Sequence, residues 1–238
     1  WAASASKAAT FRLEDGEVCD FSLNGQIETG DARTLSELLD TYPSFNGGGP
    51  SLCLNSAGGS IEEALALVDL LRTRYVATHV IAHAICESAC ALVFMAGTSF
   101  SDDMTRFDRT LAPSARLGFH APDLDISGGV YTGEAVSRAY ALALESIVEV
   151  SRRLLRRGIS ETLLNSMLTT PPTDMYYIET TGEAVVNEIT IESDAIYSAR
   201  IEEIVYNVCV AAQSIIVARL SPWIHQGPGG AVTRISSR

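Results

Sequence analysis

A chain of 238 residues is long enough for one substantial α/β domain with room for a helical appendage. Its 29 acidic and 17 basic residues give a formal charge of -12, which repels a phosphate backbone, so nucleic acid is not an expected partner. No apolar run reaches the roughly 18 residues that a membrane helix needs, so no membrane span is expected.

The chain opens with a small polar stretch, residues 1–10, which we expect to be a flexible tail. Its first residue is Trp1, and this start is typical of a trimmed tail or of what remains after a leader is removed. The opening therefore favours an exported protein.

The first third alternates strand and helix patterns. Phe11 to Ile27 alternates apolar and polar residues and predicts a hairpin or two short strands. Asp31 is placed to cap a helix, and a short strand follows at Leu52 to Leu54. Ser60 with Glu63 has the spacing of a capping box and predicts the start of the next helix.

The middle of the chain contains two further apolar strands. Val76 to Ile85 is β-branched and apolar, and it predicts one buried strand that leads into an apolar helix at Ala91 to Ala96. A polar loop is expected from Thr98 to Pro113, followed by a strand from Ala115 to Phe119. Strands that alternate with helices in this way indicate a mainly parallel sheet with helical cover.

The remainder is mostly helical by pattern. A long helix is expected from about Gly133 to Arg157, and a short one begins after Ser160. Thr180 with Glu183 begins a helical turn between two short strands. The expected strands are Tyr176 to Ile178 and Glu188 to Ile191, and a final amphipathic helix is expected from Ala195 to Leu220.

Ser88 lies where the buried strand gives way to the apolar helix, a position at which backbone N–H groups are unpaired. This place suits a nucleophile, although a serine there also suits a helix cap. Gly58 and Gly59 form a similar junction, where the backbone can approach a substrate or can simply make a tight turn. A nucleophile and oxyanion donors are thus one interpretation of these two junctions.

Among the four histidines, His120 is the best candidate for a base, because it directly follows an expected strand and so reaches the carboxyl edge of a sheet. His79 and His83 share one face of an expected strand and are interpreted as core or surface residues. His225 lies in a segment rich in glycine and proline.

Five cysteines lack the CxxC pairs of a zinc site, so no metal is expected. Cys86 and Cys90 flank Ser88 and are one candidate disulfide, while Cys19 with Cys209 is another. The remaining interpretation is that most of the cysteines are small buried apolar residues.

Four segments, in this order, carry a resemblance to the Clp protease proteolytic subunit and its exported ClpP-like relatives. The first is Asn55-Ser56-Ala57-Gly58-Gly59-Ser60, and the second is Cys86-Glu87-Ser88-Ala89-Cys90-Ala91 with Met95-Ala96-Gly97. The third is Gly118-Phe119-His120-Ala121-Pro122, and the fourth runs from Asp174 to Ile189. The resemblance extends over roughly Phe21 to Ile191.

This resemblance implies a serine peptidase of the ClpP/crotonase superfamily. The implied fold has repeated β-β-α units and a mainly parallel sheet with helical cover, over residues 11–192, followed by an extra C-terminal helix and tail in 193–238. The implied triad is Ser88, His120 and Asp174, with Asp123 and Asp125 as rival partners for His120. The N–H groups of Gly59 and Ala89 are the implied oxyanion hole. No cofactor is expected, and the implied substrate is a polypeptide.

The sequence departs from the family pattern at three places. Ala57 stands where a proline usually precedes the two glycines, Cys90 replaces a glycine, and the segment from Thr98 to Pro113 is longer. These differences leave a homo-oligomer and a partner ATPase open.

The likeness to exported relatives and the cysteine usage favour the periplasm. Two other functions stay open, an acyl-CoA enzyme of the crotonase type and a catalytically silent scaffold.

Overall fold

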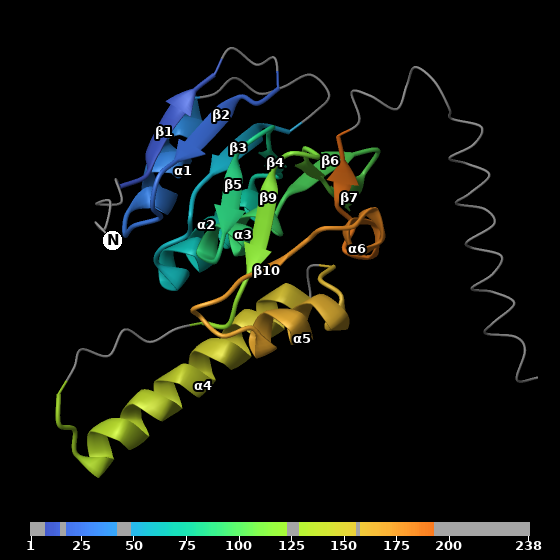
Figure 1. Ribbon diagram of the computed structural model, residues 1–238. Coiled ribbons are helices and arrows are strands. Elements are labelled where there is room, and N and C mark those ends of the chain that lie inside the picture. Colours follow the sequence, from blue (N-terminus) through green and yellow to red (C-terminus); the bar gives the residue numbers. More distant parts are fainter. Residues whose placement is uncertain (1–7, 15–17, 42–48, 123–128, 156–157, 193–238) are drawn as a thin grey trace, which may run out of the picture. The chain divides into compact units, whose positions relative to one another are not determined.

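The computed structural model describes residues 8–14, 18–41, 49–122, 129–155 and 158–192 (Figure 1). All of them belong to the first of two units into which the chain divides, Trp1–Glu192. The C-terminal helix expected from Ala195 to Leu220 lies outside the described residues. Across the part described, none of the helices combines the length and the apolar character that crossing a membrane requires.

The larger sheet has six strands in the order β1-β2-β3-β4-β8-β11. Only β1 and β2 pair antiparallel, as the expected hairpin requires, and every other neighbouring pair is parallel. The molecule is therefore a mixed α/β protein with a mostly parallel sheet. The strands are β1 (Thr10–Leu13), β2 (Phe21–Asn24), β3 (Ser51–Asn55), β4 (Ala77–Val80), β8 (Arg109–Leu111) and β11 (Thr190–Ile191).

A smaller sheet in the order β10-β9-β5 delivers the candidate site residues. Its strands are β5 (Ile85–Glu87), β9 (Arg116–Phe119) and β10 (Tyr176–Tyr177). β5 and β9 run parallel, so the residues that follow them, Ser88 and His120, emerge at the same edge. β10 pairs antiparallel with β9.

Two expectations for the middle of the chain were wrong. Val76 to Ile85 is not one strand, because a turn at residues 81–84, with His83 at a φ of 65°, passes the chain from β4 in one sheet to β5 in the other. The segment from Thr98 to Pro113 is not a plain loop either. It contains a hairpin of β6 (Thr98–Ser101) and β7 (Met104–Phe107), followed by β8.

Polar caps fix the starts of three helices. The side chains of Ser60 and Ser160 each accept a hydrogen bond from the backbone N–H of the residue three positions later, and Thr180 forms the full capping box with Glu183. The box expected at Ser60 is only half formed, because the carboxylate of Glu63 accepts from the Ala32 N–H instead. The helices are α1 (Asp31–Thr41), α2 (Ile61–Thr73), α3 (Ala89–Phe94), α4 (Gly133–Leu155), α5 (Glu161–Thr169) and α6 (Thr181–Val186).

Two disulfides stand in the described structure, Cys19–Cys53 and Cys86–Cys90. The second was one of the candidates from the sequence. The pairing of Cys19 with Cys209 was wrong, because β2 and β3 are parallel neighbours and bring Cys19 beside Cys53. The same four cysteines are buried, as the third interpretation expected, and they are also paired.

The core lies between the sheets and the helices. α3 is buried along its whole length, and α2 contributes Leu67, Val68 and Leu71 to the same cluster. A buried helix with no polar face has little freedom to shift. The residue immediately before α3, which is Ser88, is therefore held by a closely packed element.

Candidate active site

Ser88 occupies the sharp turn between β5 and α3 with a φ of 57° and a ψ of -125°. A non-glycine residue at positive φ costs about 1–3 kcal/mol and persists only where its surroundings hold it. The Ser88 N–H donates to the Gly118 carbonyl, which ties the turn to β9. The side chain makes no capping hydrogen bond to α3, so the interpretation of this serine as a helix cap was wrong.

Gly58 and Gly59 bring a second backbone junction against this turn. A Cβ added at Gly58 would lie 2.7 Å from the Ser88 Cβ and 3.1 Å from the Ala89 nitrogen. A Cβ at Gly59 would lie 2.2 Å from the Ile27 carbonyl oxygen. Both glycines also have positive φ values, so larger residues would be excluded by space and by backbone conformation.

Two backbone N–H groups, of Gly59 and Ala89, belong to the junctions that meet at Ser88. Among the described residues, neither the Gly59 N–H nor the Ala89 N–H donates a hydrogen bond. The contact between Gly58 and the Ser88–Ala89 backbone keeps these two junctions side by side. The pair is thus available to a negatively charged oxygen, and their role as an oxyanion hole stays a prediction.

His120 directly follows β9, is half-buried, and has its Nδ1 atom 2.7 Å from the Ala121 carbonyl oxygen. Since a carbonyl oxygen only accepts, Nδ1 carries the proton of the neutral ring. Nε2 then holds the lone pair, which is the form a general base requires.

Ser88 and His120 line one small pocket, with room for about a single water molecule at roughly 10 Å³. Within the described part of the chain, no hydrogen bond joins the Ser88 hydroxyl to the imidazole. The pocket is otherwise walled by Ala89, Pro122 and a set of apolar side chains from four helices and β9, namely Ile61, Leu92, Phe119, Val150 and Met167. A hydroxyl, an imidazole and an apolar cavity therefore share one place.

Asp174 is exposed, just before β10, and is not hydrogen-bonded to His120 in the described structure. Its Oδ1 atom accepts from the Met175 N–H at 2.8 Å, and its own N–H donates to the Pro171 carbonyl. Tyr176 pairs with Phe119, so the segment carrying Asp174 runs alongside the end of β9. Asp174 as the residue orienting His120 stays a prediction. The rival carboxylates, Asp123 and Asp125, lie outside the described residues.

Glu87, the neighbour of the serine, belongs to a cluster that crosses all three strands of the smaller sheet. The Tyr177 hydroxyl donates to its carboxylate at 2.9 Å, and Arg116 forms an ion pair with it at 3.1 Å. Burial, and then the hydrogen bond to Glu87, raises the pKa of Tyr177. Glu87 is thus fixed by β9 and β10.

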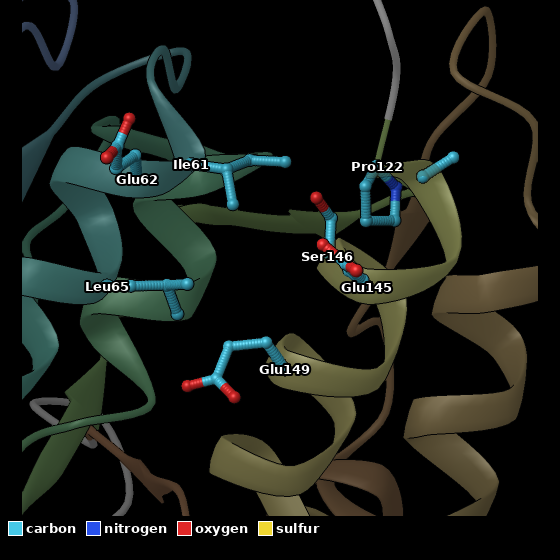
Figure 2. Close-up of a pocket in the computed structure, with 8 residues that line it drawn as sticks. Ile61, Glu62, Leu65, Pro122, Glu145, Ser146 and Glu149 are labelled. Atoms are coloured by element: carbon cyan, nitrogen blue, oxygen red, sulfur yellow. The ribbon is translucent and has the colours of Figure 1, made fainter. Parts of the chain in front are cut away.

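A larger groove of about 440 Å³ adjoins the small pocket, and the two share Ile61 and Pro122 in their walls. Figure 2 shows Ile61 and Leu65 on α2 facing Ser146 and Glu149 across the groove. Hydrogen bonds from Arg153 and then Arg152 lower the pKa of Glu149, so this carboxylate is ionised at neutral pH. The groove and the Ser88–His120 pocket are therefore adjacent.

Comparison with known families assigns the chain to one of them. The Clp protease family model matches residues 22–148, just over half of the chain. This chain belongs to the Clp protease family. The matched segment includes both glycines, Ser88, Ala89 and His120, and it ends before Asp174. No curated protein sequence matches the chain.

The Clp protease family consists of peptidases, which are hydrolases that act on polypeptide substrates. The open groove beside Ser88 suits that class of substrate. Three of the four motif segments fall inside the match, and the fourth, from Asp174 to Ile189, lies beyond it.

Sequence reasoning on this Clp protease family member missed three features of the site. The Ala121 carbonyl as the partner of His120 Nδ1 has no signal in the sequence, because any residue supplies a carbonyl. The walls from Val150 and Met167 depend on how α4 and α5 pack. Tyr177 lies in one of the four motif segments, but its contacts with Glu87 and Arg116 depend on the pairing of β10 with β9 and of β9 with β5.

Proposed function

We propose that this protein is a serine peptidase in which Ser88 is the nucleophile and His120 the base. The observation that carries the proposal is the turn at Ser88, whose side chain makes no cap to the helix and which lines the same pocket as His120. A serine held in this way without a structural task is typical of a nucleophile.

The chemistry follows from the atoms in this pocket. His120 Nε2 takes the proton of the Ser88 hydroxyl as the oxygen forms a bond to the peptide carbonyl carbon. The oxygen of that carbonyl becomes negative and accepts hydrogen bonds from the Gly59 and Ala89 N–H groups. When the carbon–nitrogen bond breaks, His120 returns the proton to the leaving amine. Water, activated by the same imidazole, then hydrolyses the acyl-enzyme and restores Ser88.

Asp174 is our proposed third member of the triad. In the structure the Ala121 carbonyl holds His120 Nδ1, and Asp174 lies on the segment that runs antiparallel beside it. A carboxylate at Nδ1 stabilises the imidazolium that forms during the reaction better than a neutral carbonyl does. The active conformation therefore requires the turn at Asp174 to exchange its hydrogen bond to Met175 for one to His120.

We assign a polypeptide substrate to the groove between α2 and α4. The groove opens onto the Ser88–His120 pocket through their shared walls, Ile61 and Pro122. The pocket itself is apolar and nearly filled, so an apolar substrate side chain would enter by displacing its walls. Family membership favours an extended peptide as the occupant of this groove.

We further propose the repeated β-β-α fold of the ClpP/crotonase group for residues 11–192, with 193–238 as a separate C-terminal helix and tail. The mostly parallel sheet and family membership support the fold.

An exported, periplasmic protein is our proposal for location, supported by the two disulfides, which form in oxidising compartments.

A homo-oligomer is also proposed. An exposed apolar row on α4 supports it, because a helix face of this kind is normally covered. The row consists of Val136, Tyr140, Leu144 and Val148. Light scattering on the purified chain tests the proposal, and replacing Leu144 and Val148 with glutamate should yield a monomer.

Hydrolysis of an unfolded polypeptide tests the proposed function. Ser88→Ala should abolish turnover, while Ser160→Ala, which removes a serine that does cap a helix, should keep turnover and lose about 1 kcal/mol of stability. A wild-type protein that is folded but does not cleave peptides supports the silent scaffold instead. Turnover of CoA thioesters that survives Ser88→Ala supports the crotonase-type enzyme.

A further inference from the structure

The disulfide between Cys86 and Cys90 encloses the proposed nucleophile. Cys86 lies in β5 and Cys90 in the first turn of α3, so the bridge spans only Glu87, Ser88 and Ala89. Both cysteines are fully buried, and their Cα atoms lie 5.1 Å apart. The bridge therefore closes the loop that holds the Ser88 hydroxyl and the Ala89 N–H.

The turn it closes needs support from outside. Ser88 is at positive φ and its side chain makes no cap, so neither local preference nor a helix cap stabilises this conformation. Two hydrogen bonds hold the strand side of the turn: the Glu87 N–H donates to the Ser56 carbonyl, and the Ser88 N–H donates to the Gly118 carbonyl. The Ala91 N–H donates to the Ser88 carbonyl on the helix side, and the disulfide adds a covalent tie between β5 and α3.

On the helix side, the first turn of α3 is fixed by the packing of this buried helix together with the disulfide. α3 has only six residues, and a helix of that length does not form on its own in water. Its first turn supplies both the Ala89 N–H and the pocket wall at Leu92. A shift of this turn would therefore displace one oxyanion donor and one wall at once.

We propose that the Cys86–Cys90 disulfide is a positioning element for Ser88, and that peptidase activity requires it to be formed. This inference rests on the proposed function. Opening the bridge takes two electrons from a dithiol, which becomes a cyclic disulfide while the two sulfurs become thiols. Since both cysteines are buried, this exchange requires the fold to open, so the state of the bridge is set when the chain folds.

The second disulfide provides a matched control. Cys19 lies two residues before the start of β2, and its disulfide joins it to Cys53 in the middle of β3. Neither cysteine lines the pocket or the groove. Each bridge closes a loop in the same unit of the chain, 1–192. Removing Cys19–Cys53 should lower stability and leave the chemistry at Ser88 unchanged.

The test compares two double variants, Cys86→Ala with Cys90→Ala and Cys19→Ala with Cys53→Ala. For folded protein, we measure the rate of Ser88 labelling by a fluorophosphonate, together with kcat and KM for a peptide. Loss of Cys86–Cys90 should lower the labelling rate and kcat about 10- to 100-fold with little change in KM, because the reacting atoms are misplaced while the groove is intact. The control variant should match wild type in all three. Equal labelling of both variants overturns the proposal.

A third variant separates positioning from packing. Cys86→Val with Cys90→Ala refills much of the volume that the sulfurs occupied without joining the two residues. It should regain melting temperature but not kcat, whereas recovery of both would show that only packing matters and would overturn the proposal.

A measurement on wild-type protein needs no variant to fold. Dithiothreitol in mild urea should abolish activity at the rate at which Cys86–Cys90 is reduced, and not at the rate at which Cys19–Cys53 is reduced. Alkylation of the released thiols and mass spectrometry measure the two rates. Full activity in molecules with Cys86–Cys90 reduced overturns the inference. If oxidised wild-type protein neither labels nor cleaves, the proposed function itself has failed instead.

Discussion

Gly58 packs directly against Ser88, so close that a single methyl group on the glycine would lie 2.7 Å from the Ser88 Cβ. Carbon atoms that are not bonded do not approach this closely, so one of the two junctions would have to move. The same contact keeps the N–H groups of Gly59 and Ala89 together. The Gly58–Ser88 contact therefore joins the proposed nucleophile to both proposed oxyanion donors.

Gly58→Ala should abolish peptide hydrolysis and destabilise the protein by about 1–3 kcal/mol, because the new Cβ meets backbone and because its φ of 106° is strained for alanine. Gly133→Ala is the matched control, since nothing lies within 4 Å of its added Cβ and it begins α4. The control should keep wild-type activity. Thermal melts and peptide cleavage measure both effects, and an active Gly58→Ala protein would contradict the contact.

Asp174→Asn should lower kcat by about 100-fold or more, because an amide cannot stabilise the imidazolium as a carboxylate does. The effect on stability should be small, because within the described residues this exposed side chain accepts one hydrogen bond, from the Met175 N–H. Glu161→Gln, another exposed acid, on α5, should have no effect and serves as the control. Steady-state kinetics decide the matter. Unchanged kcat in Asp174→Asn would mean that the Ala121 carbonyl alone orients His120.

Ser146→Trp should obstruct the groove seen in Figure 2, because Ser146 is half-buried on its α4 wall. We expect kcat/KM for a peptide to fall at least about tenfold, while labelling of Ser88 by a small fluorophosphonate stays at the wild-type rate. Ala141→Trp places the same side chain on an exposed part of α4 and should leave both unchanged. A Ser146→Trp protein that cleaves peptides normally would remove the groove from the substrate path.

His79 should make the fold less stable in mild acid. Burial lowers its pKa from the ordinary value of 6.5, and the nearby carboxylates Asp108, Glu192 and Asp20 offset this only in part. The unfolded chain therefore takes up a proton that the folded chain resists, and the free energy of unfolding falls as the pH drops below about 6.5. His79→Gln should lose less stability than wild type between pH 7 and 5 in urea titrations. Identical losses would contradict this.

Local patterns predicted the parts of the fold that local physics determines. The caps at Ser60, Ser160 and Thr180 came from side-chain spacing alone. The turn at residues 81–84 did not, because the apolar run from Val76 to Ile85 has no glycine or proline to mark the break. The turn arises because β4 belongs to the larger sheet and β5 to the smaller one, and membership of a sheet depends on long-range strand pairing.

The candidate site divides in the same way. Sequence motifs indicated Ser88, His120 and the two glycines, and the structure brings Ser88 and His120 into one pocket. The pairing of Cys19 with Cys53 depends on which strands are neighbours, so residue spacing could not distinguish it from Cys19 with Cys209.

The proposed mechanism requires a reactive Ser88. Treating the oxidised protein with diisopropyl fluorophosphate and mapping the adduct by peptide mass spectrometry tests it directly. We predict one adduct, on Ser88, formed rapidly in wild type and at least about 100-fold more slowly in His120→Ala. An unmodified Ser88 in folded, oxidised protein, or labelling that is unaffected by loss of His120, would contradict the proposed mechanism.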